Sequence, residues 1–313
     1  MNLFLSLLTG PAPSANYRGE SDHNRAVIQK LVIGQDQYPV ISPEAIRNGL
    51  REMLRTYGLD CNRQRERNAE QPTVSFADYP DPKRFVDDFL FGYMVVNREQ
   101  IPKAKRAKFV YKRDSILRNN LAIGLTPYLH ETLFTQAPNV VHRDNPEKAP
   151  AWSNADSSQL LHREMTFTAY QLPMALNLDD CQLESETHRL WLAYFLQALS
   201  ELTFVGGNLT RSYFEMAPVS AIARVTPRLA SGYPLYPFQC DGTAASVIQP
   251  ILRGDKPGHG LHFAGELLDT LSQEQSAALT DKGVQLHRTP EGLLNNLSMT
   301  HCGRPMPALE TAP

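Results

Sequence analysis

Three arginines recur at every fourth position inside a predicted helix. Arg47, Arg51 and Arg55 follow Ser42-Pro43-Glu44, which has the serine cap, the first-turn proline and the first-turn acid of a helix start. Residues four apart lie on one side of a helix, so the guanidinium groups should line one edge of it. A guanidinium presents fixed donors that match phosphate oxygens. The row therefore indicates either a phosphate-binding edge or an ordinary solvated helix face.

Two further segments carry donors that suit a sugar–phosphate backbone. The segment before the helix supplies Asn16, Arg18, Arg25 and Lys30. A second segment, GGNLTRSYF, supplies Gly207, Asn208 and Arg211, and its glycines permit a close approach of the main chain to a ligand. A plain turn after a helix would explain the same glycines, so both interpretations stay open at this point.

Catalytic and metal chemistry receive little support from the sequence. It contains no GxSxG, HExxH, Walker A or GxGxxG motif. His259 and His262 are three apart but have no clear third ligand, which favours a surface loop. Asp87-Asp88 and Asp179-Asp180 are neighbours along the chain, and neighbouring side chains diverge, so neither pair suits acid–base work. We expect no catalytic residue, no metal site and no cofactor.

The cysteines and the N-terminus indicate a cytoplasmic protein. Cys61, Cys181, Cys240 and Cys302 lack CxxC spacing, which favours reduced thiols over a zinc ribbon or a disulfide framework. The first ten residues, MNLFLSLLTG, have no positive charge, and their apolar run is shorter than that of a signal peptide. We expect a buried β-strand there and no membrane segment.

The charge of the chain is unevenly distributed. The formal net charge is −2, but residues 1–120 carry 19 Lys/Arg against 14 Asp/Glu, and residues 121–313 carry 12 against 19. A near-neutral total therefore hides a basic first part, where a polyanion would be attracted most strongly.

The order of predicted elements indicates an α+β fold. The apolar spacing predicts strands over 2–9, 116–128, 166–178 and 216–226, and helices over 25–32, 43–57 and 184–203. Residues 61–72 are polar and are predicted to form a loop, and residues 129–163 are predicted to be irregular and projecting. This order is close to a βαββαβ plan, with two helices on one face of an antiparallel sheet and the other face free for a ligand.

Five segments in this order resemble a known family. They are SANYRGESDHNRAVIQKL, YPVISPEAIRNGLREML, FVDDFLFGYMV, KRDSILRNNLAIGLTPY and GGNLTRSYFEMAPVSAIARVT. Over about residues 1–230 the chain is similar to the DevR branch of the seventh Cas protein superfamily, the guide-RNA-binding backbone subunit of type I CRISPR Cascade, in its type I-B-like form.

The resemblance implies an RNA-recognition-motif (ferredoxin-like βαββαβ) palm with a fingers insertion and a projecting thumb. The implied divisions are palm 1–58, fingers 59–113, palm strand 114–128, thumb 129–167, and palm with a C-terminal extension 168–313. It also implies a non-catalytic subunit that polymerises along the spacer of the CRISPR RNA (crRNA) and holds it for pairing with target DNA. The implied partners are crRNA, target DNA, further copies of the chain, the small-end and large-end Cascade subunits, and a nuclease-helicase or transposition proteins.

The resemblance also assigns roles to single residues. Arg47 and Arg51 would grip guide phosphates, and Asn16, Arg18 and Arg25, with Lys30, would approach the RNA backbone from the preceding loop. Gly207, Asn208 and Arg211 would contact the guide from the later loop. Trp152 and His162 are thumb candidates by chemistry and position. On this interpretation, Arg47→Glu with Arg51→Glu should abolish guide binding and leave the fold intact.

Two alternative functions stay open. A type III-like backbone subunit would cleave RNA with an aspartate of the first loop, Asp22 or Asp36. A stand-alone DNA-binding regulator would work without guide RNA.

Overall fold

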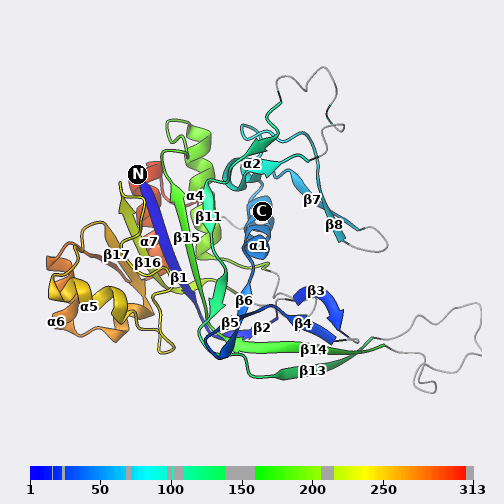
Figure 1. Cartoon of the computed structure of the whole chain (residues 1–313). Coiled ribbons are helices and arrows are strands. Elements are labelled where there is room, and N and C mark those ends of the chain that lie inside the picture. The colour runs from blue at the N-terminus through cyan, green and yellow to red at the C-terminus, as the bar shows by residue number, and fades with distance from the viewer. Residues whose placement is uncertain are drawn as a thin grey trace, which may run out of the picture.

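The computed structural model describes residues 1–15, 17–22, 25–67, 72–96, 101, 109–137, 159–205 and 215–307. Its centre is a nine-stranded sheet, in which β11 also pairs with β15 and the other strands follow the order β18-β17-β16-β1-β15-β12-β6-β5 (Figure 1). The bounds are β1 Asn2–Thr9, β5 Lys30–Ile33, β6 Asp36–Ile41, β11 Leu117–Asn119, β12 Ala122–Gly124, β15 Tyr170–Asn177, β16 Pro218–Thr226, β17 Leu261–Gly265 and β18 Gln285–His287. Every neighbouring pair is antiparallel except β17 with β18.

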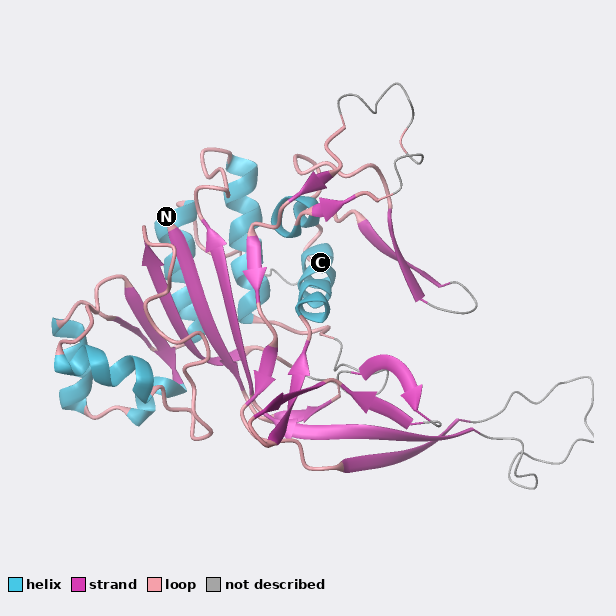
Figure 2. Cartoon of the chain, in the orientation of Figure 1, coloured by secondary structure: helices cyan, strands magenta, loops and turns pink. Residues whose placement is uncertain are grey.

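Strand β1 is buried on both faces because its sequence, NLFLSLLT, is apolar at nearly every position. Leu3, Leu5 and Leu7 pack into one core with three helices, α1 Pro43–Thr56, α4 Glu186–Ser200 and α7 Pro290–Cys302. Figure 2 shows α4 and α7 behind the sheet and α1 to the side of β11. Phe4 and Leu8 pack into a second core on the opposite face.

The C-terminal part of the chain forms that second core. It contains α5 Ala245–Arg253, the 3₁₀ helix η4 Glu266–Thr270 and α6 Gln273–Asp281. Buried polar groups on this face are satisfied by the same segment: Ser6 Oγ donates to the Leu235 carbonyl at 2.9 Å, and Gln171 Oε1 accepts from the Phe238 N–H at 3.2 Å. The expectation of a free sheet face is therefore wrong at β1 and β16, since apolar side chains distant in sequence cover it.

Helix α1 forms as its sequence predicts. The Ser42 hydroxyl caps it by accepting from the Ala45 N–H at 3.2 Å, and Pro43 occupies the first turn. The stripe that includes Ile46, Leu50 and Leu54 is fully buried. The helix ends at Thr56, and Gly58 takes a φ of +82°, which favours glycine.

Three segments differ from the sequence-based expectation. The helix predicted over 25–32 is wrong, and this segment forms the strands β4 Arg25–Ile28 and β5. Strand β5, which contains the β-branched Val32 and Ile33, pairs with β6 across a turn at Gly34. The loop predicted over 61–72 contains the strand β7 Arg63–Arg67, which pairs with β8 Pro72–Phe76. The predicted strand 116–128 is divided into β11 and β12.

The segment predicted to be irregular between 129 and 163 begins and ends as a long hairpin. Strand β13 Glu131–Ala137 pairs with β14 Gln159–Thr168, from Glu131 opposite Met165 to Ala137 opposite Gln159. Residues 138–158 lie outside the described residues. Strand β14 also pairs with β4 and with β2 Ala12–Ser14, and β4 pairs with β3 Tyr17–Asp22. This second sheet fixes the base of the hairpin.

Two expectations drawn from composition can be compared with the structure. All four cysteines are free, as predicted. Across the described ranges, no helix combines the length and the hydropathy that crossing a lipid bilayer requires.

A histidine cluster makes the packing of α7 against β17 and β18 sensitive to acid. His262 Nδ1 lies 3.1 Å from His287 Nε2, and burial, followed by the charges of His287 and His301, lowers the pKa of His262 to about 4. A histidine normally titrates near pH 6.5, so this depressed pKa contributes stability above that pH, which is lost as the pH falls toward 4. Lowering the pH from 7 to 5 should cost on the order of 2 kcal/mol at this group.

We expect the melting temperature of His262→Gln to depend less on pH between 7 and 5 than that of the parent chain. The exposed His259 is the matched control, and His259→Gln should keep the parental dependence. Equal pH dependence in both variants would contradict this account. The measurement is thermal unfolding by circular dichroism at several pH values.

Candidate nucleic-acid interface

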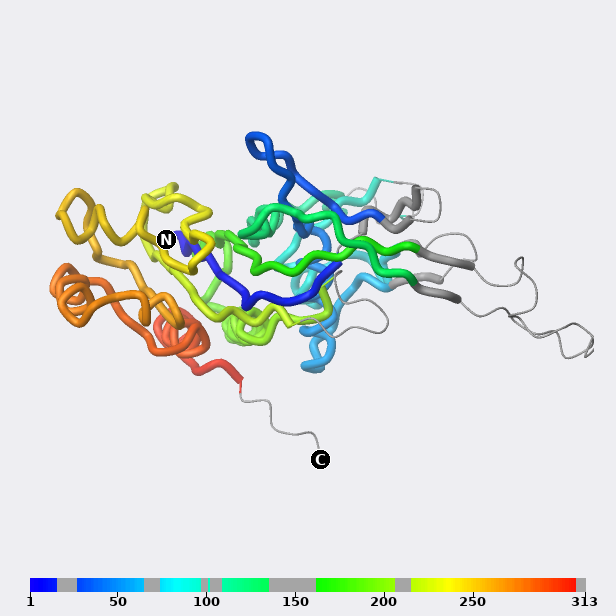
Figure 3. The backbone as a smooth tube through the Cα atoms, turned by 90° about the horizontal axis from the view of Figure 1, so that it is seen from below, coloured from blue at the N-terminus to red at the C-terminus, as the bar shows by residue number. Residues whose placement is uncertain are grey.

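Two arms project from the same side of the main sheet, and α1 lies between them (Figures 1 and 3). The first, called the β7–β8 arm, comprises the described residues of 59–113 and includes α2 Val86–Phe91 with the short strands β9 Tyr93–Met94 and β10 Lys112–Arg113. The second, called the β13–β14 arm, comprises the described residues of 129–168. The elements with the predicted contact residues therefore surround one side of the molecule.

Arg47 joins α1 to the sheet. Its Nε donates to Asn119 Oδ1 at 2.7 Å and its Nη2 to the Leu117 carbonyl at 3.0 Å. The Asn119 amide in turn donates to the Pro43 carbonyl at the start of α1. Burial is the main cause that lowers the pKa of Arg47, although a guanidinium stays charged in proteins. Two of the donors of Arg47 are thus used inside the chain.

Arg51 lies in a buried ionic cluster, called the Asp87–Asp88 cluster, with Asn62, Arg63, Asp87 and Asp88. Both carboxylates are fully buried. Arg51 Nε donates to Asp87 Oδ2 at 2.9 Å, Arg63 contacts both carboxylates, and Asn62 donates to both, at 2.7 and 2.8 Å. Burial is the largest influence on Asp88 and raises its pKa. The expectation that the two aspartates diverge is wrong, because in the first turn of α2 both reach the same guanidinium.

Arg55 completes the row and is also paired. It donates to Glu52 at 2.7 Å and to the Arg63 carbonyl. Its side chain is 39% exposed, against 12% for Arg51. The row is therefore neither uniformly solvated nor open along its length, and the change Arg51→Glu would place an acid beside buried Asp87. We therefore no longer expect the double variant Arg47→Glu, Arg51→Glu to leave the fold intact, because it would put two acids together in a buried site.

Lys30 connects β5 to the base of the β13–β14 arm. Its ammonium lies 2.7 Å from Glu164 Oε2 and 4.3 Å from the centre of the Tyr128 ring. Glu164 is only 3% exposed and also accepts from the Ile28 N–H at 3.1 Å. No pattern in the sequence indicates this partner, which lies 134 residues away.

The other predicted residues fall into two groups. Arg18 and Arg25 belong to β3 and β4, and in the ladders Arg25 lies opposite Asp22 and opposite His162 of β14. His162 is exposed, and its ring meets Phe134 edge-on with centroids 5.5 Å apart. The predicted residues outside the described part of the chain are Asn16, Trp152, Gly207, Asn208 and Arg211.

The described ends of the 206–214 segment lie against α1. A β-carbon on Gly49 would come within 2.9 Å of the Thr203 carbonyl and of Val205, so glycine permits this close packing. On the other side, the Met216 N–H donates to the Leu202 carbonyl at 2.7 Å. The structure thus brings Thr203 and Val205, which precede this segment in the chain, beside the helix that carries the arginine row.

The cleavage alternative named Asp22 and Asp36. Asp36 is exposed at the β5–β6 turn, and Asp22 lies in β3. Among the residues that the structure describes, no group of three His, Cys, Asp or Glu side chains could hold a metal ion.

Comparisons with known proteins agree with the resemblance seen in the sequence. No family model matches the chain. A CRISPR-associated protein Cas7/Cst2/DevR from Myxococcus xanthus (strain DK1622) is 26% identical over 299 residues, which cover 92% of this chain and 93% of that protein. The resemblance of the chain to the DevR branch of the seventh Cas protein superfamily is confirmed by this relative.

Two solved structures share the fold. A chain of a CRISPR RNA-guided surveillance complex has a TM-score of 0.57 at 15% identity, over 96% of this chain and 99% of that one. A chain of such a complex in a pre-nicking state has a TM-score of 0.57 at 14% identity, over 96% and 100%. These likenesses confirm a mixed α/β architecture with a large sheet.

The Asp87–Asp88 cluster predicts a large stability loss when one charge is removed. Arg51→Met should cost about 3 kcal/mol of unfolding free energy, because it leaves a buried carboxylate with one guanidinium fewer. Arg55→Ala, at the same spacing in a half-exposed pair, should cost less than about 1 kcal/mol. Urea unfolding followed by tryptophan fluorescence measures both. Equal midpoints would show that the cluster does not hold the arm to α1.

Proposed function

We propose, from the premise that the chain is a DevR-branch relative of the seventh Cas protein superfamily, that it is a non-catalytic backbone subunit of a type I Cascade. It binds crRNA, and several copies polymerise along the spacer and hold it for pairing with target DNA. The observation that carries the proposal is the pair of arms flanking α1, in a fold shared along nearly the whole chain with CRISPR RNA-guided surveillance complexes. The type I-B-like assignment belongs to the same proposal.

The strand order supports a ferredoxin-like palm. Within the sheet, β16, β1, β15 and β12 are consecutive and antiparallel. Helix α1 lies between β1 and β12 in the chain, and α4 between β15 and β16. Each helix thus connects two strands separated by a third, as in a split βαβ unit. The proposed divisions are palm 1–58, 114–128 and 168–313, fingers 59–113 and thumb 129–167.

Because the second face of the sheet is covered, we expect RNA to bind at the arms and not on the sheet. RNA-recognition motifs stack bases on an open sheet face, but here Phe4, Leu8 and Ile222 are buried beneath the C-terminal segment. The guide would therefore run between the arms and along α1, over Arg18, Arg25 and the 206–214 segment. Such binding needs no reading of bases, because pairing with the target supplies sequence specificity.

The other members of the complex follow from the same proposal. The chain would contact further copies of itself, the small-end and large-end Cascade subunits, and a nuclease-helicase or transposition proteins. These partners are argued from the family resemblance and from the surveillance complexes that share the fold.

Arg25→Ala with Arg211→Ala should weaken guide-RNA binding and lower the slope of log affinity against log salt by about one unit per lost phosphate contact. The control is Arg253→Ala, on α5 in an exposed pair with Asp255, which should leave the slope unchanged. Filter binding of crRNA over a salt series measures both. An unchanged slope in the double variant would contradict the contact, and metal-dependent cleavage of the RNA would contradict the non-catalytic assignment.

The thumb is tested by multi-copy assembly. Trp152→Ala should weaken assembly on crRNA, since stacking on a base contributes about 1–3 kcal/mol, and should leave the melting temperature of the single subunit unchanged. Phe134→Ala is a companion variant, because Phe134 is 57% exposed beside His162. Analytical ultracentrifugation with crRNA measures assembly. A lower melting temperature with normal assembly would assign Trp152 to a core.

A further inference from the structure

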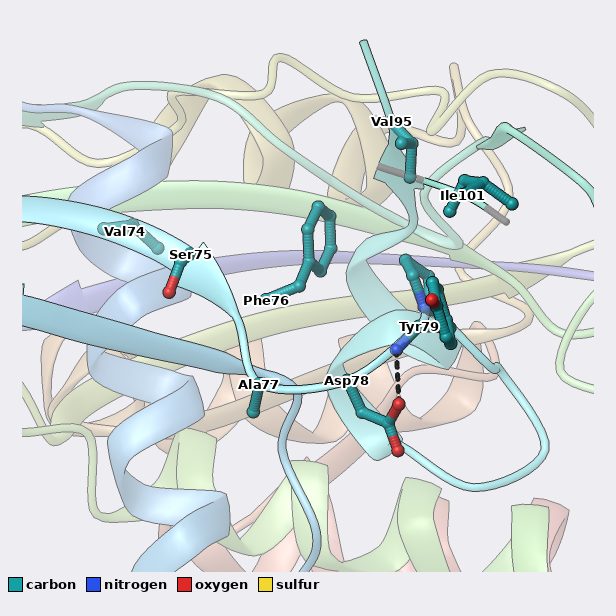
Figure 4. Close-up of a pocket in the computed structure, with 9 residues that line it drawn as sticks. Val74, Ser75, Phe76, Ala77, Asp78, Tyr79, Val95 and Ile101 are labelled. Carbon is teal, nitrogen blue, oxygen red and sulfur yellow. Dashed lines mark hydrogen bonds between the residues drawn. The ribbon is translucent and has the colours of Figure 1, made fainter. Parts of the chain in front are cut away.

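An aromatic pocket opens on the β7–β8 arm (Figure 4). Its volume is 510 Å³, within the ordinary range for ligand pockets. The apolar lining includes Val74, Phe76, Tyr79, Val95 and Ile101. In Figure 4 the Phe76 ring stands between Val74 and Tyr79, with Val95 and Ile101 above it.

The two aromatic rings are held in place by their surroundings. The Phe76 ring has the Arg63 guanidinium 4.6 Å from its centre, so it is tied to the Asp87–Asp88 cluster. The Tyr79 N–H donates to Asp78 Oδ1 at 2.8 Å, and Asp78 is fixed by Arg84 at 2.6 Å. The Tyr79 ring meets Phe109 edge-on at 6.3 Å. Because Tyr79 is still 38% exposed, it presents a preset aromatic surface to solvent.

The sequence that adjoins the pocket residue Ile101 is basic, which favours a polyanion. Residues 103–113 contain six Lys/Arg and no Asp/Glu, and Phe109 of this stretch contacts Tyr79. In the β7–β8 ladder Arg65 lies opposite Val74. An apolar peptide would need no basic surroundings, whereas a nucleic-acid strand needs both phosphate neutralisation and a stacking surface.

We infer that this pocket holds an unpaired base of a single-stranded nucleic acid, stacked against Tyr79 and Phe76. The inference rests on the proposed function, which supplies two strands of this chemistry, the guide RNA and the target DNA. Stacking accepts any base, which suits a subunit that does not read sequence. None of the residues that line the pocket belongs to α1, so the pocket would add a contact to those proposed along that helix.

The direct test is fluorescence anisotropy of the full chain with a short labelled oligothymidine strand. Tyr79→Ala should weaken binding about tenfold, and Tyr79→Phe, which keeps the ring, should bind as the parent does. Val74 is 62% exposed, so it accepts charge without loss of the fold. Val74→Glu should weaken binding and Val74→Lys should not. Equal binding by Tyr79→Ala and Tyr79→Phe overturns the proposal, and so does equal weakening by both Val74 variants, which would indicate an apolar protein contact.

Photo-crosslinking separates the two sources of the base. Guide RNA substituted with 4-thiouridine and complementary DNA substituted with 5-iododeoxyuridine are each bound and irradiated, and the crosslinked peptide is identified. A crosslink at Tyr79 or Phe76 from either strand supports the pocket, and none from both overturns it. Failure of the parent chain to retain guide RNA would instead overturn the proposed function, because the oligothymidine assay does not need a guide.

Discussion

The orientation of the β7–β8 arm depends on the pairing of two buried carboxylates with two guanidinium groups. Removing Asp87 and Asp88 from water costs several kcal/mol per ion unless each is paired and hydrogen-bonded. Arg51 reaches Asp87 from α1, while Arg63 reaches both aspartates from the start of β7. These partners satisfy the charges in only one arrangement of helix, hairpin and α2. The cluster therefore contributes geometry more than net stability, and it fixes the arm relative to α1.

Arg63 of the same cluster also contacts the main chain just after α2. Arg63 Nη2 donates to the Gly92 carbonyl at 2.8 Å, and Gly92 takes a φ of +65°. A β-carbon at Gly92 would collide with the Arg113 carbonyl, so only glycine lets the returning strand pass this closely. The start of the arm thus lies in the polar network, and its end packs against Gly92. An arm held in this way can project from the main sheet and still keep a defined direction.

The sequence predicts elements that depend on local periodicity and misses those that depend on distant partners. Strand β1 and helices α1 and α4 follow from apolar spacing and caps, and they are present close to the expected bounds. Strand β7 could not be predicted in this way, because RQRER pairs through its backbone and carries no apolar alternation. For the site, periodicity places Arg51 on one side of α1, but it cannot show that Asp87, 36 residues later, takes its charge.

The covered sheet explains why the basic residues lie where they do. Both faces of β1 are used for packing, so a strand of RNA has no sheet surface on which to stack. The C-terminal segment that covers the second face belongs to the acidic part of the chain, which carries 12 Lys/Arg against 19 Asp/Glu from residue 121 onward. The first 120 residues, which include α1 and the β7–β8 arm, carry an excess of Lys and Arg that attracts a polyanion. The C-terminal segment, in contrast, completes the second core and covers that face of the sheet.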